Sequence, residues 1–322
     1  MNEQKDETVL DEAAIELMRT DARSIITGAR ISQSAAAQEA NVAPGTFNAW
    51  LAGTYKGDNA KVAAEVGKWL EARRQRNRIK AIVPVAPSFI ETKTGREILD
   101  LLQFAQTLKD MGLIVGSPGV GKTMAVDFYR ATRPSVYVAT MEPAKSSVHH
   151  LLLELANVLK ISEKSAIAIS DAVIKRLRDR DALLVFDEAQ HLQSAAIDQI
   201  RTIHDKAGCG VVLVGNESVV SKLGDPERTP QLAQLYSRIG LRLNINRPKP
   251  ADVEALTAAW SVSDKEERQF LKLVANKPGA LRALTKTLVA AGAMAAGHEE
   301  ARHLGHMRDA WSRVGAGPIG NS

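Results

Sequence analysis

Gly116-Ser-Pro-Gly-Val-Gly-Lys122-Thr123 fits the pattern G-x-x-x-x-G-K-[ST] at every fixed position. It follows the apolar run Gly112–Val115 and precedes a segment with helical spacing, which is the strand–loop–helix context that the pattern requires. The glycines let backbone N–H groups turn toward phosphate oxygens, and the helix N-terminus favours negative charge. The pattern therefore predicts a nucleotide-phosphate site made by Gly116, Ser117, Pro118, Gly119, Val120, Gly121, Lys122 and Thr123.

Two motifs predict the chemistry of this site. The Lys122 ammonium is expected to reach the β- and γ-phosphates, and the Thr123 hydroxyl to bind Mg²⁺. The apolar run Leu183–Phe186 predicts a buried strand that ends in Asp187 and Glu188. Asp187 is suited to hold Mg²⁺ through water, and Glu188 to orient the water that attacks the γ-phosphate. We therefore expect ATP and Mg²⁺ as ligands and ATP hydrolysis as the reaction.

Further polar residues follow in the order that a phosphoryl-transfer site needs. Asn216 ends the run Val211–Val214 and is expected to face the γ-phosphate or its water, although Gly-Asn also makes an ordinary turn. Arg238, with Arg242 as the fallback, is a candidate arginine finger that acts across a subunit interface. A surface arginine or an intramolecular ion pair is the alternative. Arg282 is expected to fold back onto the nucleotide.

Around these motifs, short β-branched runs alternate with helical segments, which predicts an α/β fold with a parallel sheet between helices. The expected strands are Leu113–Val115, Val136–Thr140, Leu183–Phe186 and Val211–Val214, with helices at 147–160 and 165–180 among others. Proline-containing segments at 81–88 and 247–250 delimit this block, so we expect three domains: 1–80, 81–246 and 247–322. The last is expected to be all-helical, with helices at about 251–260, 264–275, 279–296 and 299–313.

The first block has the pattern of a helix–turn–helix, with helices expected at 34–40 and 44–52. Asn41 suits the tight turn because it tolerates a left-handed backbone, and Val42 is the expected buried turn residue. Phe47, Trp50 and Leu51 are expected to point inward. Thr46 and Asn48 are then left to face a DNA groove. A small helical domain that binds protein is the alternative.

Charge is informative only when it is divided along the chain. The 322 residues carry 42 Lys and Arg against 37 Asp and Glu, a net charge of +5, and residues 81–240 are neutral. Six basic residues lie between positions 68 and 80: Lys68, Arg73, Arg74, Arg76, Arg78 and Lys80. They suit a phosphate backbone, as does Lys56, or else they are a solvated helix end.

Other features exclude several classes of protein. The single cysteine, Cys209, excludes a disulfide framework and a cysteine-ligated zinc site. The longest apolar runs are too short for a membrane span, and the polar first residues do not resemble a secretory signal. We therefore expect a cytoplasmic protein without a membrane partner.

Over about residues 95–300 the motifs resemble those of AAA+ ATPases, in which Asn216, Arg238 and Arg282 correspond to sensor 1, the arginine finger and sensor 2. Nearly the whole chain is similar to the phage Mu transposition protein B family. The similarity also rests on Thr54–Asn59, Phe89–Thr92, Asp187–His191 and Lys277–Arg282. It is weakest in the first 30 residues, which are more acidic here.

The resemblance implies a DNA-binding ATPase with little sequence preference that assembles on duplex DNA with ATP as a filament or ring. It also implies delivery of target DNA to a DDE transposase, stimulation of hydrolysis by that transposase, and target immunity. Lys145 in the loop 142–147, and Lys175 and Arg176 in the helix 171–180, are then candidate DNA contacts; interleaved acidic residues favour a solvated face for the helix. A helix–turn–helix transcription factor and a helicase loader or secretion-type ATPase are the rival functions.

Overall fold

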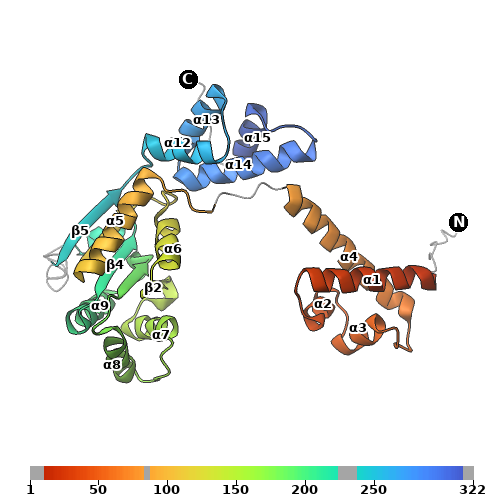
Figure 1. Cartoon of the computed structure of the whole chain (residues 1–322), viewed down its shortest axis with the longest axis horizontal. Coiled ribbons are helices and arrows are strands. Elements are labelled where there is room, and N and C mark those ends of the chain that lie inside the picture. The colour runs from red at the N-terminus through yellow and green to blue at the C-terminus, as the bar shows by residue number, and fades with distance from the viewer. Residues whose placement is uncertain (1–10, 83–87, 224–237, 315–322) are drawn as a thin grey trace. The chain divides into compact units, whose positions relative to one another are not determined.

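A computed structural model of the chain describes residues 11–82, 88–223 and 238–314 (Figure 1). The chain divides into two compact units, Met1–Val83 and Pro84–Ser322. Most of the expected linker at 81–88 and the first ten, acidic residues lie outside the described residues. No helix in the described ranges is both long enough and apolar enough to span a membrane.

The described part of the first unit, residues 11–82, contains four helices: α1 Glu12–Gly28, α2 Gln33–Glu39, α3 Pro44–Leu51 and α4 Asn59–Ile82. The turn between α2 and α3 places Asn41 in the left-handed region at φ 55°, as the sequence predicts. Phe47, Trp50 and Leu51 point into the core, also as predicted. Thr46 and Val42 are both half-buried, so Thr46 is less exposed and Val42 less buried than expected; Asn48 is exposed.

The second unit contains a five-stranded sheet with the order β2-β3-β4-β1-β5, in which every neighbouring pair is parallel. Its strands are β1 Met111–Gly116, β2 Val136–Thr140, β3 Leu183–Asp187, β4 Gly210–Gly215 and β5 Ile239–Ile245. The expected α/β class is confirmed, and four of these strands coincide with predicted ones. All five carboxyl ends lie at one edge of the sheet, because the strands are parallel.

Helices cover both faces of the sheet (Figure 1). They are α5 Lys93–Leu108, α6 Lys122–Thr132, α7 Val148–Leu159, α8 Ala166–Leu177, α9 Ser194–Ala207 and α10 Glu217–Leu223, with short 3-10 turns at Pro143–Lys145 and Ala189–His191. Successive strand residues point to opposite faces. Leu113 therefore packs with α7, α8 and α9, while Ile114 packs with α5 and α6. This alternation buries β1, β3 and β4 on both sides of the sheet.

Four further helices are described after β5: α12 Pro250–Ala259, α13 Lys265–Ala275, α14 Ala280–Gly297 and α15 Leu304–Val314. Their core is built around Trp260, Phe270 and Trp311. Asp252, which is fully buried, joins them to α5: it accepts hydrogen bonds from the backbone N–H of Thr94 (2.9 Å), the Thr94 hydroxyl and the backbone N–H of Lys249. The C-terminal helices are thereby fixed to the first turn of α5.

Candidate nucleotide-binding site

The loop between β1 and α6 has the backbone that phosphate binding requires. Gly119 and Gly121 adopt φ of 85° and 102°, a left-handed conformation that favours glycine. A Cβ on Gly119 would overlap the carbonyl oxygen of Gly279, and the backbone N–H of Arg282 donates to the Gly119 oxygen at 3.2 Å. The loop is thus in direct contact with the N-terminal turn of α14.

Lys122 lies at the first position of α6, with its ammonium folded into the loop. Its Nζ donates to the carbonyl oxygens of Gly116 (2.6 Å) and Ser117 (3.0 Å). Burial lowers the pKa of Lys122, and the charges of Asp187 and Glu188 oppose that decrease. This half-buried ammonium, held by two carbonyl oxygens of the loop, lies where it can bind phosphate oxygens.

Thr123 and Asp187 meet where α6 begins and β3 ends. The Thr123 hydroxyl donates to Asp187 Oδ2 at 2.9 Å, and the backbone N–H of Glu188 donates to Oδ1 at 2.9 Å. Burial raises the pKa of Asp187, which is only 4% exposed, and the Thr123 hydrogen bond opposes that increase. A buried carboxylate beside a hydroxyl provides the oxygen ligands that a hard divalent cation prefers.

Gln190, which the sequence analysis did not single out, links the ends of β3 and β4. Its side-chain amide donates to Glu188 Oε2, and its carbonyl oxygen accepts from the backbone N–H of Asn216 at 3.4 Å. A Cβ on Gly215 would lie 2.6 Å from this same oxygen, so the glycine makes room for the contact. The position of Gln190 two residues after Glu188, next to a predicted strand end, was the available signal.

Asn216 and Arg282 both lie at the edge of the site. The Asn216 side-chain oxygen accepts from the backbone N–H of Ser218 at 3.0 Å, at the start of α10. This is the turn geometry that was the alternative to a contact with phosphate. Arg282 is exposed, and its positive charge contributes to lowering the pKa of Lys122, after burial, so its guanidinium lies within electrostatic range of that ammonium.

Arg238 lies immediately before β5 and forms an ion pair with Asp205 of α9. The two side chains are 46% and 36% exposed. Within one chain Arg238 therefore forms an intramolecular ion pair, which was the alternative to an arginine finger. Arg242, on β5, is also exposed. The residues just before Arg238, 224–237, lie outside the described ranges.

Comparison with known proteins agrees with this geometry. A family profile described as "AAA domain" matches residues 106–223, and one described as "Mu B transposition protein, C terminal" matches residues 237–314. The protein named "ATP-dependent target DNA activator B" of Escherichia phage Mu is 33% identical over 299 residues, which is 92% of this chain and 95% of that protein. This chain belongs to the phage Mu B transposition protein family.

Two other proteins are similar to this Mu B family member. The Mu-like prophage FluMu DNA transposition protein B of Haemophilus influenzae is 33% identical over 81% of this chain and 92% of that protein. A RuvB variant from Thermotoga maritima is similar in structure, with a TM-score of 0.49 and 15% identity, covering 72% of each chain. The fold of the second unit is that of an AAA+ P-loop NTPase.

The basic residues of the first unit that are expected to contact DNA differ in their ion pairs and in their exposure. Arg73 forms a two-pronged pair with Glu39 of α2 (2.7 and 2.9 Å) and is 12% exposed. Its hydrogen bonds lower the pKa of Glu39, so the pair joins α2 to α4. Arg74 pairs with Asp21 of α1, whereas Lys56 is exposed.

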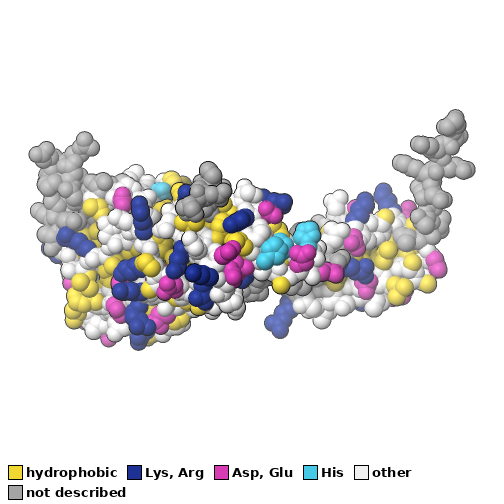
Figure 2. Space-filling view, turned by 90° about the horizontal axis from the view of Figure 1, so that it is seen from above, with side chains coloured by type: hydrophobic (Ala, Val, Ile, Leu, Met, Phe, Trp, Pro, Cys, Tyr) yellow, Lys and Arg dark blue, Asp and Glu magenta, His cyan; other side chains and the backbone are white. Residues whose placement is uncertain are grey.

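In the second unit the candidate DNA contacts also include both ion-paired and exposed side chains. Lys145 pairs with Glu142 (3.4 Å) and Glu154 (3.5 Å), and these carboxylates raise its pKa. Lys175 and Arg176 are exposed near the end of α8. On the face seen in Figure 2, Lys and Arg side chains are interspersed with acidic ones. The structure brings the nucleotide residues together, but it leaves the DNA candidates distributed over several elements.

Proposed function

We propose that this protein is an ATP-dependent DNA-binding ATPase that activates target DNA for transposition. The observation that carries the proposal is the convergence of Lys122, Thr123 and Asp187 at one edge of the sheet. The chain that holds them is 33% identical to a protein named ATP-dependent target DNA activator B. A transcription factor or a helicase loader has no comparable support.

The residues divide the work of phosphoryl transfer among them. Lys122 and the loop N–H groups bind the β- and γ-phosphates, and Thr123 with Asp187 holds Mg²⁺, Asp187 through water. The site fits this ion because a buried carboxylate lies 2.9 Å from a hydroxyl. When bound, Mg²⁺ neutralises charge on the phosphate oxygens. Glu188 orients the attacking water once its carboxylate leaves the amide of Gln190.

Hydrolysis is coupled to assembly through Arg238. In a filament or ring, the guanidinium reaches the phosphates bound by a neighbouring subunit and stabilises charge in the transition state. It must first leave Asp205, with which it pairs in the single chain. In this proposal, Asn216 and Arg282 detect whether the γ-phosphate is present. A single subunit therefore binds ATP but hydrolyses it slowly.

Binding to duplex DNA relies on the phosphate backbone. The exposed face of α3 offers the small, neutral side chain of Asn48 and the half-buried Thr46, which suits weak base readout. Lys56 and the exposed Lys175 and Arg176 supply positive charge. The low sequence preference suits a protein that delivers any target DNA to a DDE transposase, and hydrolysis stimulated by that transposase releases DNA near existing element ends.

Footprinting on random duplex DNA, with and without ATP, tests the proposal. We expect extended protection with ATP only, and none for Lys122→Ala, which loses the phosphate ligand. Lys265→Ala, an exposed lysine of α13, is the matched control and is expected to behave as the wild type. A discrete protected sequence would instead identify a transcription factor. ATP-independent coating would show that the nucleotide site does not control DNA binding.

A further inference from the structure

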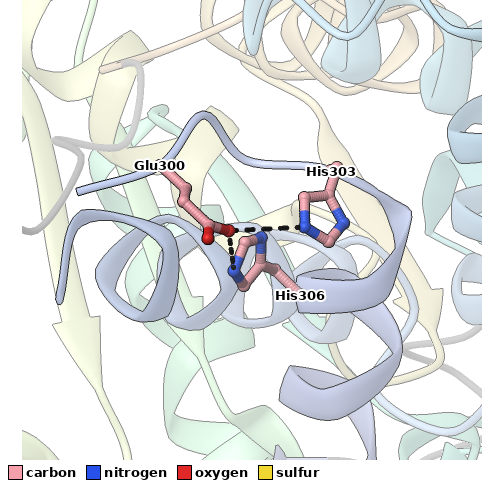
Figure 3. Close-up of side chains that lie close together, drawn as sticks. All are labelled: Glu300, His303 and His306. Atoms are coloured by element: carbon pink, nitrogen blue, oxygen red, sulfur yellow. Dashed lines mark ion pairs between the residues drawn. The ribbon is translucent and has the colours of Figure 1, made fainter. Parts of the chain in front are cut away.

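A second polar cluster lies at the opposite end of α14 from the Gly119 contact, in the connection between α14 and α15. Three of the seven histidines of the chain occur within nine residues, at 298, 303 and 306. Glu300 Oε2 lies 3.8 Å from His303 Nε2 and 3.7 Å from His306 Nε2 (Figure 3). One potential ligand atom from each residue lies within 4.8 Å of the others.

We propose that Glu300, His303 and His306 bind a first-row transition-metal ion such as Zn²⁺. Imidazole nitrogens and a carboxylate oxygen are ligands that zinc accepts, at about 2.0–2.2 Å, so tetrahedral ligand atoms lie about 3.3 Å apart. The present separations of 3.7 and 3.8 Å are close to this spacing. The side chains of Glu300 and His303 are 59% and 60% exposed, so both can shift by the remaining distance.

His306 provides the fixed ligand of the site. It belongs to the first turn of α15, is 8% exposed, and precedes Met307, which packs in the C-terminal core. Its Nδ1 is buried and has no hydrogen-bond partner among the described residues. No hydrogen bond therefore fixes its tautomer, and the lone pair can be presented at Nε2, toward Glu300.

His303 needs a small rearrangement. The backbone N–H of Gly305 donates to its Nδ1 at 3.0 Å, which favours a proton on Nε2. Metal binding through Nε2 moves that proton to Nδ1, so the Gly305 N–H turns to water instead. Gly305 is exposed, so its N–H can exchange this hydrogen bond for one to water.

The surroundings favour a borderline metal over Mg²⁺ or Ca²⁺. Two nitrogens and one oxygen suit Zn²⁺, Ni²⁺ or Cu²⁺, whereas the harder ions prefer oxygen ligands alone. Arg302 is the nearest cation in sequence, and its guanidinium donates to the Trp260 carbonyl oxygen at 3.2 Å and interacts with Glu267. The remaining coordination position is available to water or to the exposed His298, whose ring centroid lies 6.3 Å from that of His306.

Binding of the metal ion cross-links the α14–α15 connection. Glu300 and His303 belong to the loop, and His306 to the helix, so one ion fixes the loop against α15. An ion that binds only the folded state raises the unfolding temperature in proportion to the logarithm of its concentration over Kd. This effect is independent of ATP.

Calorimetric titration of the full-length protein with ZnCl₂, in excess Mg²⁺ and without chelators, tests the site. We expect one Zn²⁺ per chain, a rise in Tm on binding, and Co²⁺ absorption typical of nitrogen–oxygen coordination. His303→Ala and Glu300→Gln, both at exposed positions, should weaken binding at least about tenfold. His149→Ala, at an exposed histidine on α7, should leave it unchanged.

Two results would overturn the proposal. One is wild-type zinc affinity in both His303→Ala and Glu300→Gln. The other is the lack of any zinc-dependent change in Tm for the wild type. His306→Ala is informative only alongside these variants, because its loss of a buried ring also lowers stability.

Discussion

At the residue scale, the amide of Gln190 holds the carboxylate that is expected to orient the attacking water. Glu188 has a left-handed backbone, φ 56°, which turns the chain sharply at the end of β3 and brings Gln190 back toward it. The contact restrains Glu188 in the resting chain. Removing the carboxylate and removing its restraint should therefore have different effects.

We expect Glu188→Gln to bind ATP and DNA normally but to hydrolyse ATP about 10²–10⁴ times more slowly, the usual contribution of a positioned base. Gln190→Ala should keep the reaction and raise the basal rate in the absence of DNA. Phosphate release with and without DNA measures both. Unchanged turnover in Glu188→Gln would mean that another group orients the water.

Cys209 offers a probe of folding. Burial raises the pKa of its thiol to about 12, and it is fully inaccessible just before β4. Because the thiolate is the reactive form, the folded protein should resist thiol reagents at pH 8 and react only on unfolding. Labelling followed across a urea titration should coincide with loss of helical circular dichroism. Fast labelling in native buffer would contradict the burial.

Sequence reasoning found the nucleotide residues but not their partners. Lys122, Thr123 and Asp187 follow from fixed motif positions, and the structure brings them together. Gln190 and Asp205 carry no motif, because their roles depend on tertiary contacts with Glu188 and Arg238. Such pairs become visible only when the fold is known.

At the element scale, β5 was not among the strands predicted from the sequence, and it shows where prediction from hydrophobic patterns fails. β5 alternates buried and exposed positions, because it lies at the edge of the sheet beside β1 alone. The other four strands are short runs of mostly apolar residues, and such runs were the pattern from which strands were predicted. The helix expected at about 299–313 begins only at Leu304, after the loop that holds Glu300 and His303.

The joint between α5 and α12 should be a major determinant of stability. Asp252→Ala leaves the N–H and hydroxyl of Thr94 and the N–H of Lys249 without their acceptor, and buried unsatisfied groups cost about 1–3 kcal/mol each. We expect a loss of at least about 3 kcal/mol in the free energy of unfolding. Asp264→Ala, which removes the exposed N-cap of α13, should cost only about 1 kcal/mol.

Urea titrations of the two variants give this comparison. Equal losses would show that the Asp252 contacts contribute no more than a surface cap. An intact ATP affinity in Asp252→Ala would further show that the C-terminal helices need not be held at α5 for the nucleotide to bind.

At the scale of the whole molecule, the proposed exchange of Arg238 between Asp205 and a neighbouring subunit predicts that hydrolysis depends on protein concentration. We expect Arg238→Ala to bind ATP as a single subunit but to lose about 10³-fold or more of the DNA-stimulated rate. Asp205→Asn, which weakens the internal pair, should reach the stimulated rate at lower protein concentration.

Hydrolysis measured against protein concentration on long duplex DNA separates these effects. Arg242→Ala is the control and should retain the wild-type profile. If Arg242→Ala loses stimulation and Arg238→Ala does not, the finger has been assigned to the wrong arginine. If neither variant loses stimulation, hydrolysis is completed within one subunit.

The contact between Gly119 and α14 also constrains how this protein can be recombined with its relatives. A Cβ at Gly119 would overlap the carbonyl oxygen of Gly279, and a backbone hydrogen bond joins Gly119 to Arg282. Thr94 and Asp252 form a second such pair. A chimera that takes residues 250–314 from another family member must therefore inherit matching partners at positions 94 and 119, so the breakpoint near residue 249 is not neutral.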